Sequence, residues 1–330
     1  MKRLLAVVLL LCMLCAVSLA DSLITNGGVS LDTDALPHNT QDASAPVVYF
    51  IRDISPEALV KAYKALGVEL PGRVGVKMST GESSRSNYLR PGLIADLIHL
   101  VNGTIVECNT AYGGSRSSTA MHRQQARDNG LLDVAELDIL DEEGSMEIPV
   151  EGGIRINVTY VGSHFTNYDS FLVLTHFKGH AMAGFGGAIK NISIGFGSSK
   201  GKVWIHSGGT RTEGSIWGQQ DPFLEAMADA AKGVDSRMGD NIVYISVLNR
   251  LSVDCDCDGN PAEPDMHDIG ILASTDPLAI DQAAIDLVYA MPDSGSLIRR
   301  IERQNGLHTL DAGEQNGLGS RYYNLVILDD

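Results

Sequence analysis

The chain has little cysteine and no excess of positive charge, and both absences exclude classes of protein. Its 330 residues include five cysteines, and 25 lysines and arginines stand against 41 aspartates and glutamates. The formal net charge of −16 excludes a general nucleic-acid binder, which needs a basic surface to displace the counterions of the phosphates. The same acidity argues against docking on anionic lipid.

Phosphate-binding loop motifs are also missing. The chain contains neither GxxxxGK[ST] nor GxGxxG, the two glycine patterns in which backbone N–H groups cradle the phosphates of a nucleotide. No nucleotide cofactor is therefore indicated. The hydrophobic share of 44% and the charged share of 20% describe an ordinary globular chain, long enough to bury a large core without disulfide bonds.

The first twenty residues have the pattern of a secretory signal peptide. Lys2 and Arg3 form a basic start, residues 4–14 form an apolar run, and the small residues Ser18 and Ala20 precede the expected cleavage site. The apolar run is too short for a convincing membrane span, so we expect no stable span after cleavage. The sequence predicts a secreted or periplasmic protein, with an uncleaved anchor as the weaker alternative.

The rest of the chain alternates strand and helix patterns. Residues 21–45 are polar and predict a flexible leader, and residues 46–330 predict one α/β core. Strands are expected at 47–52, 73–78, 104–108, 134–139, 155–161, 171–177, 242–251, 269–274 and 325–328. Such alternation indicates a mainly parallel, doubly wound sheet with helices on both faces. The Gly/Ser-rich stretch near 195–220 is a candidate junction between two lobes.

Polar residues follow several of these strands at the point where each strand ends. In open parallel sheets, ligands bind outside the carboxyl ends of the strands, so these residues are expected at one edge. They include candidate catalytic or anion-holding groups as well as candidate metal ligands. The first set is Lys77, Glu82, Lys178 and Lys190, and the second is His176, His180, Cys255 and Cys257, with His267 and Cys108 as additions.

The two histidines and the two cysteines predict a metal site. His176 and His180 are four residues apart, and a loop can turn both imidazoles towards one ion, although His176 can equally be a core histidine. Cys255 and Cys257 offer two soft thiolates, which favour zinc, iron or an iron–sulfur cluster. The alternatives are a strained disulfide, two free thiols, or a poorly matching calcium loop that begins at Asp254.

A Gly-rich segment follows the second histidine. Gly184, Gly186 and Gly187 allow the backbone to approach a cofactor or an anionic ligand closely and to direct N–H groups at it. Lys190 follows them and can hold an anionic substrate. The alternative is a glycine-rich packing segment beneath the preceding strand.

Two parts of the chain resemble a known family. Residues 176–180 together with 184–191 resemble the core signature of the domain-of-unknown-function 362 family, and residues 255–257 with 268–283 are similar to its C-terminal signature. Many members are labelled uncharacterised iron–sulfur centre proteins and carry a ferredoxin-like insert with clustered cysteines. This chain has residues 204–220 at that place, without a cysteine. The resemblance therefore implies the common α/β core without the usual ferredoxin clusters.

Three hypotheses follow from these residues. The first is a metal-dependent or redox enzyme whose metal lies beside an anionic substrate. The second is a non-catalytic protein that binds a small anion or another small ligand and has structural cysteines. The third is a redox protein whose Cys255–Cys257 pair cycles between thiols and a disulfide. They differ in whether the chain needs a metal with an open coordination position.

Overall fold

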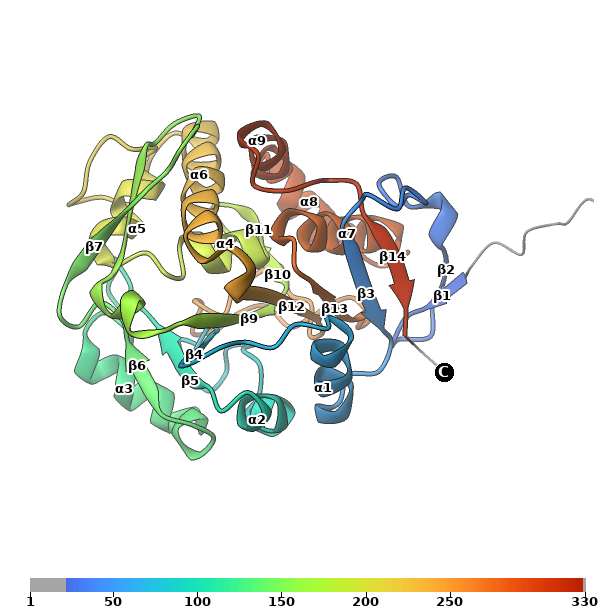
Figure 1. Ribbon diagram of the computed structural model, residues 1–330, viewed down its shortest axis with the longest axis horizontal. Coiled ribbons are helices and arrows are strands. Elements are labelled where there is room, and N and C mark those ends of the chain that lie inside the picture. The colour runs from blue at the N-terminus through green and yellow to red at the C-terminus, as the bar shows by residue number, and fades with distance from the viewer. Residues whose placement is uncertain (1–21, 329–330) are drawn as a thin grey trace, which may run out of the picture.

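A computed structural model describes residues 22–328, and the expected signal peptide lies outside this range. A central sheet of eight strands organises the fold (Figure 1). Its strands, in spatial order, are β14 (Asn324–Ile327), β3 (Val47–Ile51), β13 (Gly270–Ser274), β12 (Ile242–Leu248), β9 (Ser170–His176), β4 (Val74–Lys77), β5 (Thr104–Glu107) and β6 (Leu137–Ile139).

The sheet is mainly parallel, as the sequence predicts. The strands β12, β9, β4, β5 and β6 pair in parallel, and so do β14 and β3. Only β13 among the eight runs against its neighbours, β12 and β3. The carboxyl ends of seven strands therefore lie at one edge, where ligands bind in open α/β sheets.

Helices cover both faces of the sheet (Figure 1). The residues of β12 show why, because Ile242, Tyr244 and Leu248 pack into one apolar core and Val243, Ile245 and Val247 into a second. A strand that is apolar on both faces needs cover on both. One face carries α1 (Pro56–Ala65), α2 (Pro91–Leu100) and α3 (Thr119–Asp128). The other carries α4 (Ala188–Ser193), α5 (Ser199–His206), α6 (Gln220–Met238), α7 (Pro277–Ala290), α8 (Gly295–Arg303) and α9 (His308–Asn316).

Two helices begin where the sequence pattern predicts. The Ser55 hydroxyl accepts a hydrogen bond from the Ala58 N–H, and Pro56 occupies the first turn of α1. The Asp276 carboxylate caps α7 by accepting from the N–H groups of Leu278 and Ala279. These side chains satisfy N–H groups that have no partner within the helix.

The structure differs from the expectation in three segments outside the main sheet. Residues 155–161 were expected to add a strand to it, but β8 (Val158–Gly162) instead forms a separate antiparallel hairpin with β7 (Ser145–Pro149). The expected flexible leader contains a hairpin of β1 (Ser22–Ile24) and β2 (Ser30–Asp32), whose Leu23 is fully buried. The stretch 195–220 contains α5, which packs on α6 and β8.

The buried Leu23 explains the correction in the leader, since an apolar side chain packed in the core holds its segment in place. The division into two lobes near 195–220 stays a prediction. Within residues 22–328, none of the helices combines the length and the apolar character that a membrane crossing requires.

Candidate functional site

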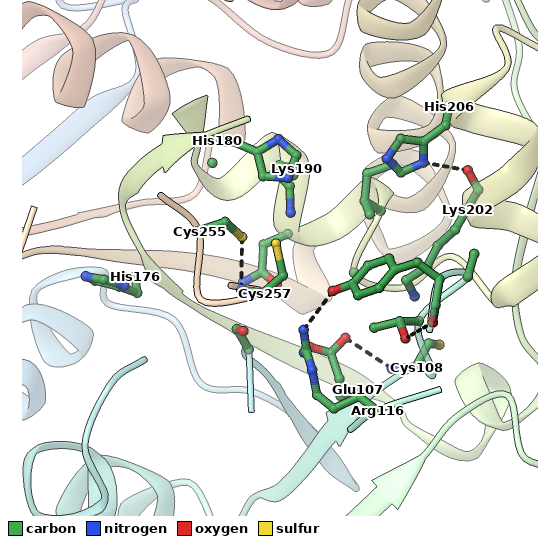
Figure 2. A pocket seen from close by; sticks show the side chains of 18 of the residues that line it. Glu107, Cys108, Arg116, His176, His180, Lys190, Lys202, His206, Cys255 and Cys257 are labelled. Carbon is green, nitrogen blue, oxygen red and sulfur yellow. Dashed lines mark hydrogen bonds and ion pairs between the residues drawn. The ribbon is translucent and has the colours of Figure 1, made fainter. Parts of the chain in front are cut away.

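A pocket lies at the carboxyl edge of the sheet, where the sequence predicts the site. Lys77, Glu107 and His176 are the last residues of β4, β5 and β9, and all three line it. The loop that follows β12 brings Cys255 and Cys257 to the same place (Figure 2). The cavity measures about 90 Å³. Because one water needs roughly 10–15 Å³ measured in this way, the cavity has room for a small molecule.

Three of the predicted metal ligands come together in this pocket. One nitrogen of His180 and the two sulfurs of Cys255 and Cys257 all lie within 4.8 Å of one another. His180 and Cys255 are buried and Cys257 is half-buried. All three cysteines of residues 22–328 are free thiols. Two thiolates and an imidazole form a ligand set that suits zinc or iron.

A glycine allows the histidine and cysteine segments to approach each other. His180 ends β10 (Lys178–His180), which pairs with β11 (Gly184–Gly186). The Gly179 N–H donates to the Ser252 carbonyl at 2.8 Å, and a Cβ at this position would lie 2.3 Å from the Val253 carbonyl oxygen. Only glycine, which has no Cβ, can approach the Val253 carbonyl this closely. The contact holds His180 beside the cysteine loop.

The tautomer of His180 is set by its backbone neighbours. Its Nδ1 accepts hydrogen bonds from the N–H groups of Met182 at 3.2 Å and Ala183 at 2.9 Å. The ring proton therefore sits on Nε2 when the ring is neutral, and the ring forms a hydrogen bond with Cys255. Burial lowers the pKa of His180, which keeps the ring neutral.

The pKa values of the two thiols are shifted in opposite directions. The pKa of Cys255 is held well below its usual value, first by a hydrogen bond from the Cys257 side chain and further by Lys190 and His180. The pKa of Cys257 is raised well above the usual value, chiefly because it donates that hydrogen bond and because its partial burial disfavours the charged form. The Cys257 N–H also donates to the Cys255 sulfur at 3.3 Å. Cys255 is therefore the more acidic thiol of the pair.

His176 does not join the metal ligands, contrary to the prediction. Its Nδ1 is 2.8 Å from Oδ1 of Asp256, and its Nε2 is 2.7 Å from the Asn249 carbonyl oxygen. Both ring nitrogens are thus engaged within the protein, and the ring is almost fully buried. The structure favours the core-histidine alternative.

Lys178 forms an ion pair with the same carboxylate. Its Nζ lies 3.1 Å from Oδ2 of Asp256 and donates to the His176 carbonyl at 2.6 Å. Burial alone would raise the pKa of Asp256, but Lys178 and His176 outweigh this effect and lower it to about 2. Lys178 lines the pocket with its charge already balanced.

Two further cations of the pocket are paired with carboxylates. Lys77 is fully buried, with Nζ 3.1 Å from Glu107 Oε1 and 2.8 Å from the side-chain oxygen of Asn191. Arg116 pairs with Glu82 at 2.9 Å and lies 3.9 Å from Glu107. These contacts connect the loops that follow β4 and β5 at the rim of the pocket.

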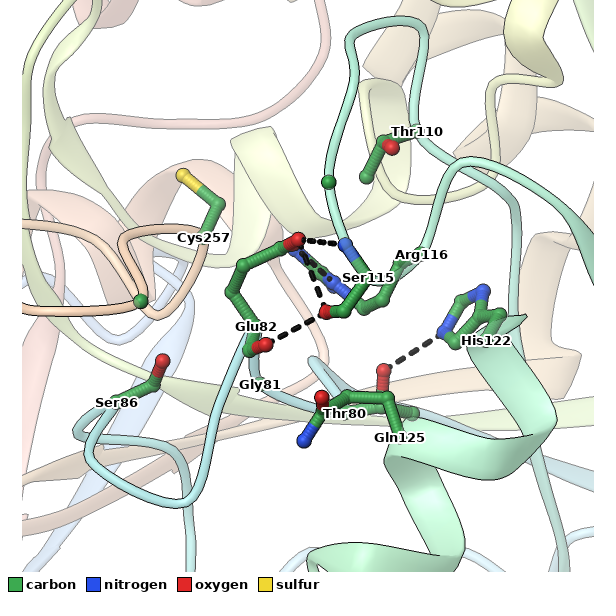
Figure 3. A network of polar contacts seen from close by, with 12 residues as sticks. Thr80, Gly81, Glu82, Ser86, Thr110, Ser115, Arg116, His122, Gln125 and Cys257 are labelled. Atoms are coloured by element: carbon green, nitrogen blue, oxygen red, sulfur yellow. Dashed lines mark hydrogen bonds and ion pairs between the residues drawn. The ribbon is translucent and has the colours of Figure 1, made fainter.

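Glu82 belongs to this connection and does not line the pocket. Its carboxylate accepts hydrogen bonds from the Ser115 N–H and from Nε of Arg116, and its own N–H donates to the Asp256 carbonyl (Figure 3). The candidate catalytic residue Glu82 therefore holds loops together. It also orients Arg116, which does face the pocket.

Two pocket lysines have no carboxylate partner within residues 22–328. Lys190 on α4 extends towards the cysteines (Figure 2). Lys202 on α5 donates to the Gly197 carbonyl at 2.6 Å. The other three cations of the pocket are balanced by Glu107, Asp256 and Glu82, so these two carry positive charge that a Cys255 thiolate offsets only in part. An anion would balance it.

The remaining predicted residues lie in different places. Gly186 and Gly187 line the pocket, whereas Gly184 lies at the start of β11 outside it. Cys108 lines the pocket and donates its S–H to the Phe196 carbonyl, and burial raises its pKa. His267 is exposed, bonded to Asp293 at 2.7 Å and outside the pocket.

The sequence reasoning missed several residues of the pocket. Glu107 and Arg116 face it, together with Lys202 and His206 of α5. The position of Glu107 at the end of a predicted strand was a usable signal. No motif marks His206, because it lies in the stretch where the expected alternation of elements breaks off.

The fold and the site define a class of protein: an α/β protein with a cationic pocket and a His/Cys/Cys group at the carboxyl edge of its sheet. A family model described as a domain of unknown function (DUF362) matches residues 74–286, well over half of the chain. The chain belongs to this family. No curated protein matches it.

Solved structures with related folds are more distant. They include the lactate racemase apoprotein from Thermoanaerobacterium thermosaccharolyticum, with 14% identity and a TM-score of 0.45 over 82% of this chain and 63% of that one. A crystal structure of a protein from Thermotoga maritima has 11% identity and a TM-score of 0.41 over 79% and 58%. This chain spans less than two thirds of the length of either.

Proposed function

We propose that this protein is a metal-dependent enzyme that acts on a small anionic substrate outside the cytoplasm. Cys255 and Cys257, with His180, hold a zinc or iron ion, and Lys190 and Lys202 hold the anion beside it. The observation that carries the proposal is the convergence of three ligand atoms within 4.8 Å on the wall of a cationic pocket. Three protein ligands leave a coordination position open for substrate or water.

The two cysteines are the primary ligands in this proposal. Nδ1 of His180 accepts from two backbone N–H groups, so binding a metal through Nε2 requires the ring proton to move to Nδ1 and both of these hydrogen bonds to break. The thiolates have no such requirement beyond the deprotonation of Cys257. We therefore expect the sulfurs to contribute more to metal affinity than the imidazole does.

The metal would supply Lewis-acid or redox chemistry at its open position. The residues of the chain would bind the substrate and orient it. Lys190 and Lys202 are the pocket cations that have no carboxylate partner among residues 22–328, and Arg116, held by Glu82 and Tyr112, directs a fixed guanidinium at the same space. Guanidinium and ammonium groups together bind carboxylate or phosphate oxygens.

The extracytoplasmic location is part of the proposal and is supported by the sequence of residues 1–20. An oxidising compartment would favour a Cys255–Cys257 disulfide in the metal-free protein. A metal that holds both thiolates would protect them from this oxidation. The location and the metal site therefore support each other.

Elemental analysis with a thiol count tests the metal. The full chain is purified without an affinity-metal column and compared with Cys255→Ser, Cys257→Ser and, as a matched control, Cys108→Ser. We expect close to one zinc or iron per chain in the wild type and in Cys108→Ser, and a near-complete loss in the other two variants. A wild-type protein that stays metal-free after incubation with zinc and with ferrous iron would contradict the proposal.

A second candidate function is a non-catalytic protein that binds a small anion. The excess charge of Lys190 and Lys202 favours it, because this charge needs no metal. Metal-free protein that binds acetate or phosphate as tightly as metal-loaded protein would support this candidate. An affinity that rises on metal loading would support the enzyme.

A further inference from the structure

His206 faces the pocket across from the cysteines. It is the last residue of α5, lines the cavity and is only 7% exposed. In Figure 2 its ring lies on the opposite side of the pocket from His180. Neither the metal nor the excess of positive charge accounts for a buried imidazole at this position.

The ring is fixed in one orientation and one tautomer. Its Nδ1 is 2.6 Å from the Lys202 carbonyl oxygen, which can only accept, so the proton sits on Nδ1. The ring stacks on Phe223 with centroids 4.8 Å apart and planes 10° apart. Burial lowers the pKa of His206 to about 3. The ring is therefore neutral, and Nε2 carries a lone pair.

That lone pair has no partner in the part of the chain that the structure describes. Nε2 lies on the side of the ring turned towards Lys190 and the cysteines (Figure 2). Glu107, the carboxylate that lines the pocket, already accepts from Lys77 and from the Cys108 N–H. His206 is thus a neutral acceptor that faces the cavity among donors.

We infer that His206 recognises a hydrogen-bond donor on the substrate, so that the substrate is a small anion with a hydroxyl or amino group next to its anionic group. This inference rests on the proposed function, because it assumes that an anion occupies the pocket. The lysines bind the anionic oxygens, and the neighbouring O–H or N–H donates to Nε2. A fixed acceptor discriminates against anions that lack the donor, since these leave Nε2 unpaired.

Acetate and glycolate, which differ by one hydroxyl group, test the inference. Their affinities for the full chain are measured by calorimetry on wild-type protein and on two variants. His206→Asn keeps a donor near the position of Nδ1 and removes the acceptor, whereas His206→Gln places an amide oxygen near the position of Nε2. We expect the wild type to bind glycolate roughly tenfold more tightly than acetate. The preference should fall to about one in the Asn variant and be largely kept in the Gln variant.

The possible failures are distinguishable. Equal affinity of the wild type for the two acids would overturn the role of His206 and leave the anion pocket standing. Binding of neither acid would overturn both. A readout independent of the variants is the ¹⁵N resonance of Nε2 in wild-type protein, which should move on addition of glycolate and stay in place on addition of acetate. A resonance that responds equally to both would also overturn the inference.

Discussion

His176 and His180 are four residues apart, but their ring nitrogens have different hydrogen-bond partners. His176 lies between Asp256 and the Asn249 carbonyl, and both of its ring nitrogens are occupied. His180 has one nitrogen fixed by backbone N–H groups and the other directed at Cys255. The first is a fully compensated core histidine, and the second is part of a group open to the pocket.

The loop that contains Asp256 shows the same contrast between a side chain paired within the protein and side chains that face the pocket. Asp256 is fully buried and compensates His176 and Lys178, while its neighbours Cys255 and Cys257 line the pocket. Of these three consecutive residues, the middle one is a buried ion-pair partner and the outer two face the pocket. Substitutions on the Asp256 side should change stability, and substitutions on the cysteine side should change ligand binding.

The largest effect is expected from removal of Asp256. Asp256→Ala leaves a buried lysine and a buried histidine without their carboxylate, and such an uncompensated charge costs about 3–5 kcal/mol. Urea unfolding followed by circular dichroism measures the loss. The exposed Asp258, two residues further on, provides the control, and Asp258→Ala should stay within about 0.5 kcal/mol of the wild type. Equal losses of unfolding free energy for the two variants would contradict the stabilising role of Asp256.

The pH dependence of stability tests the role of another buried carboxylate, that of Asp281. It is buried beneath α4, where it accepts from the N–H groups of Ala188 and Ile189, and burial raises its pKa to about 7. An unfolded aspartate has a pKa of about 3.9, so the folded state binds the proton more tightly. The free energy of unfolding should therefore fall as the pH rises from about 4 to about 7, by on the order of 2–4 kcal/mol.

The contribution of this one group is isolated by Asp281→Asn, which cannot ionise. The difference in unfolding free energy between wild type and variant, measured at several pH values across that range, should shrink as the pH rises. Because Asn places an NH2 donor where one of the two oxygens accepts a backbone N–H, the variant should be the less stable protein at the acidic end. A pH-independent difference would show that Asp281 is ionised throughout.

Lys178 and Lys190 provide a matched pair, because both line the pocket and only the first of them forms an ion pair with Asp256. Lys178→Met removes one partner of Asp256 but leaves His176, so we expect a loss of about 2 kcal/mol in unfolding free energy. Lys190→Met removes a cation that has no carboxylate partner in the described part of the chain, and we expect a change below about 1 kcal/mol together with roughly tenfold weaker binding of glycolate. Calorimetry and urea unfolding on both variants check this. A reversed pattern would exchange the roles of the two lysines.

The sequence predicts the sheet well because apolar strands and capped helices are local patterns. Its edge is also predictable, since parallel strands end together. The role of His176 is not, because its partner Asp256 lies 80 residues further along the chain and no spacing reveals which of two histidines it will bind. The sequence therefore assigned both histidines to the metal.

His267 and His206 show the same limit of sequence-based prediction: the first was expected in the site and lies outside it, and the second lines the pocket without having been expected there. His267 follows the cysteine loop, but its ring is bonded to Asp293 and packs beside Gly27 of the hairpin that was expected to be flexible. His206 lies in a Gly/Ser-rich stretch where no helix was expected. In both cases the position of the imidazole depends on a segment whose folding the local pattern does not determine.

The smallest expected effect concerns the thiolate of Cys255. After removal of metal with a chelator, iodoacetamide at about pH 6 should alkylate Cys255 before Cys257 and Cys108, because only its pKa is lowered, and the thiolate is the reactive form. His180→Phe removes a hydrogen-bond donor, raises the pKa of Cys255 and should slow its alkylation by roughly tenfold. Peptide mass spectrometry identifies the modified cysteine, and His308→Gln, on α9 outside the pocket, serves as the control. If Cys257 reacted first, the thiolate would belong to the other sulfur, and His180 would stabilise the site without activating it.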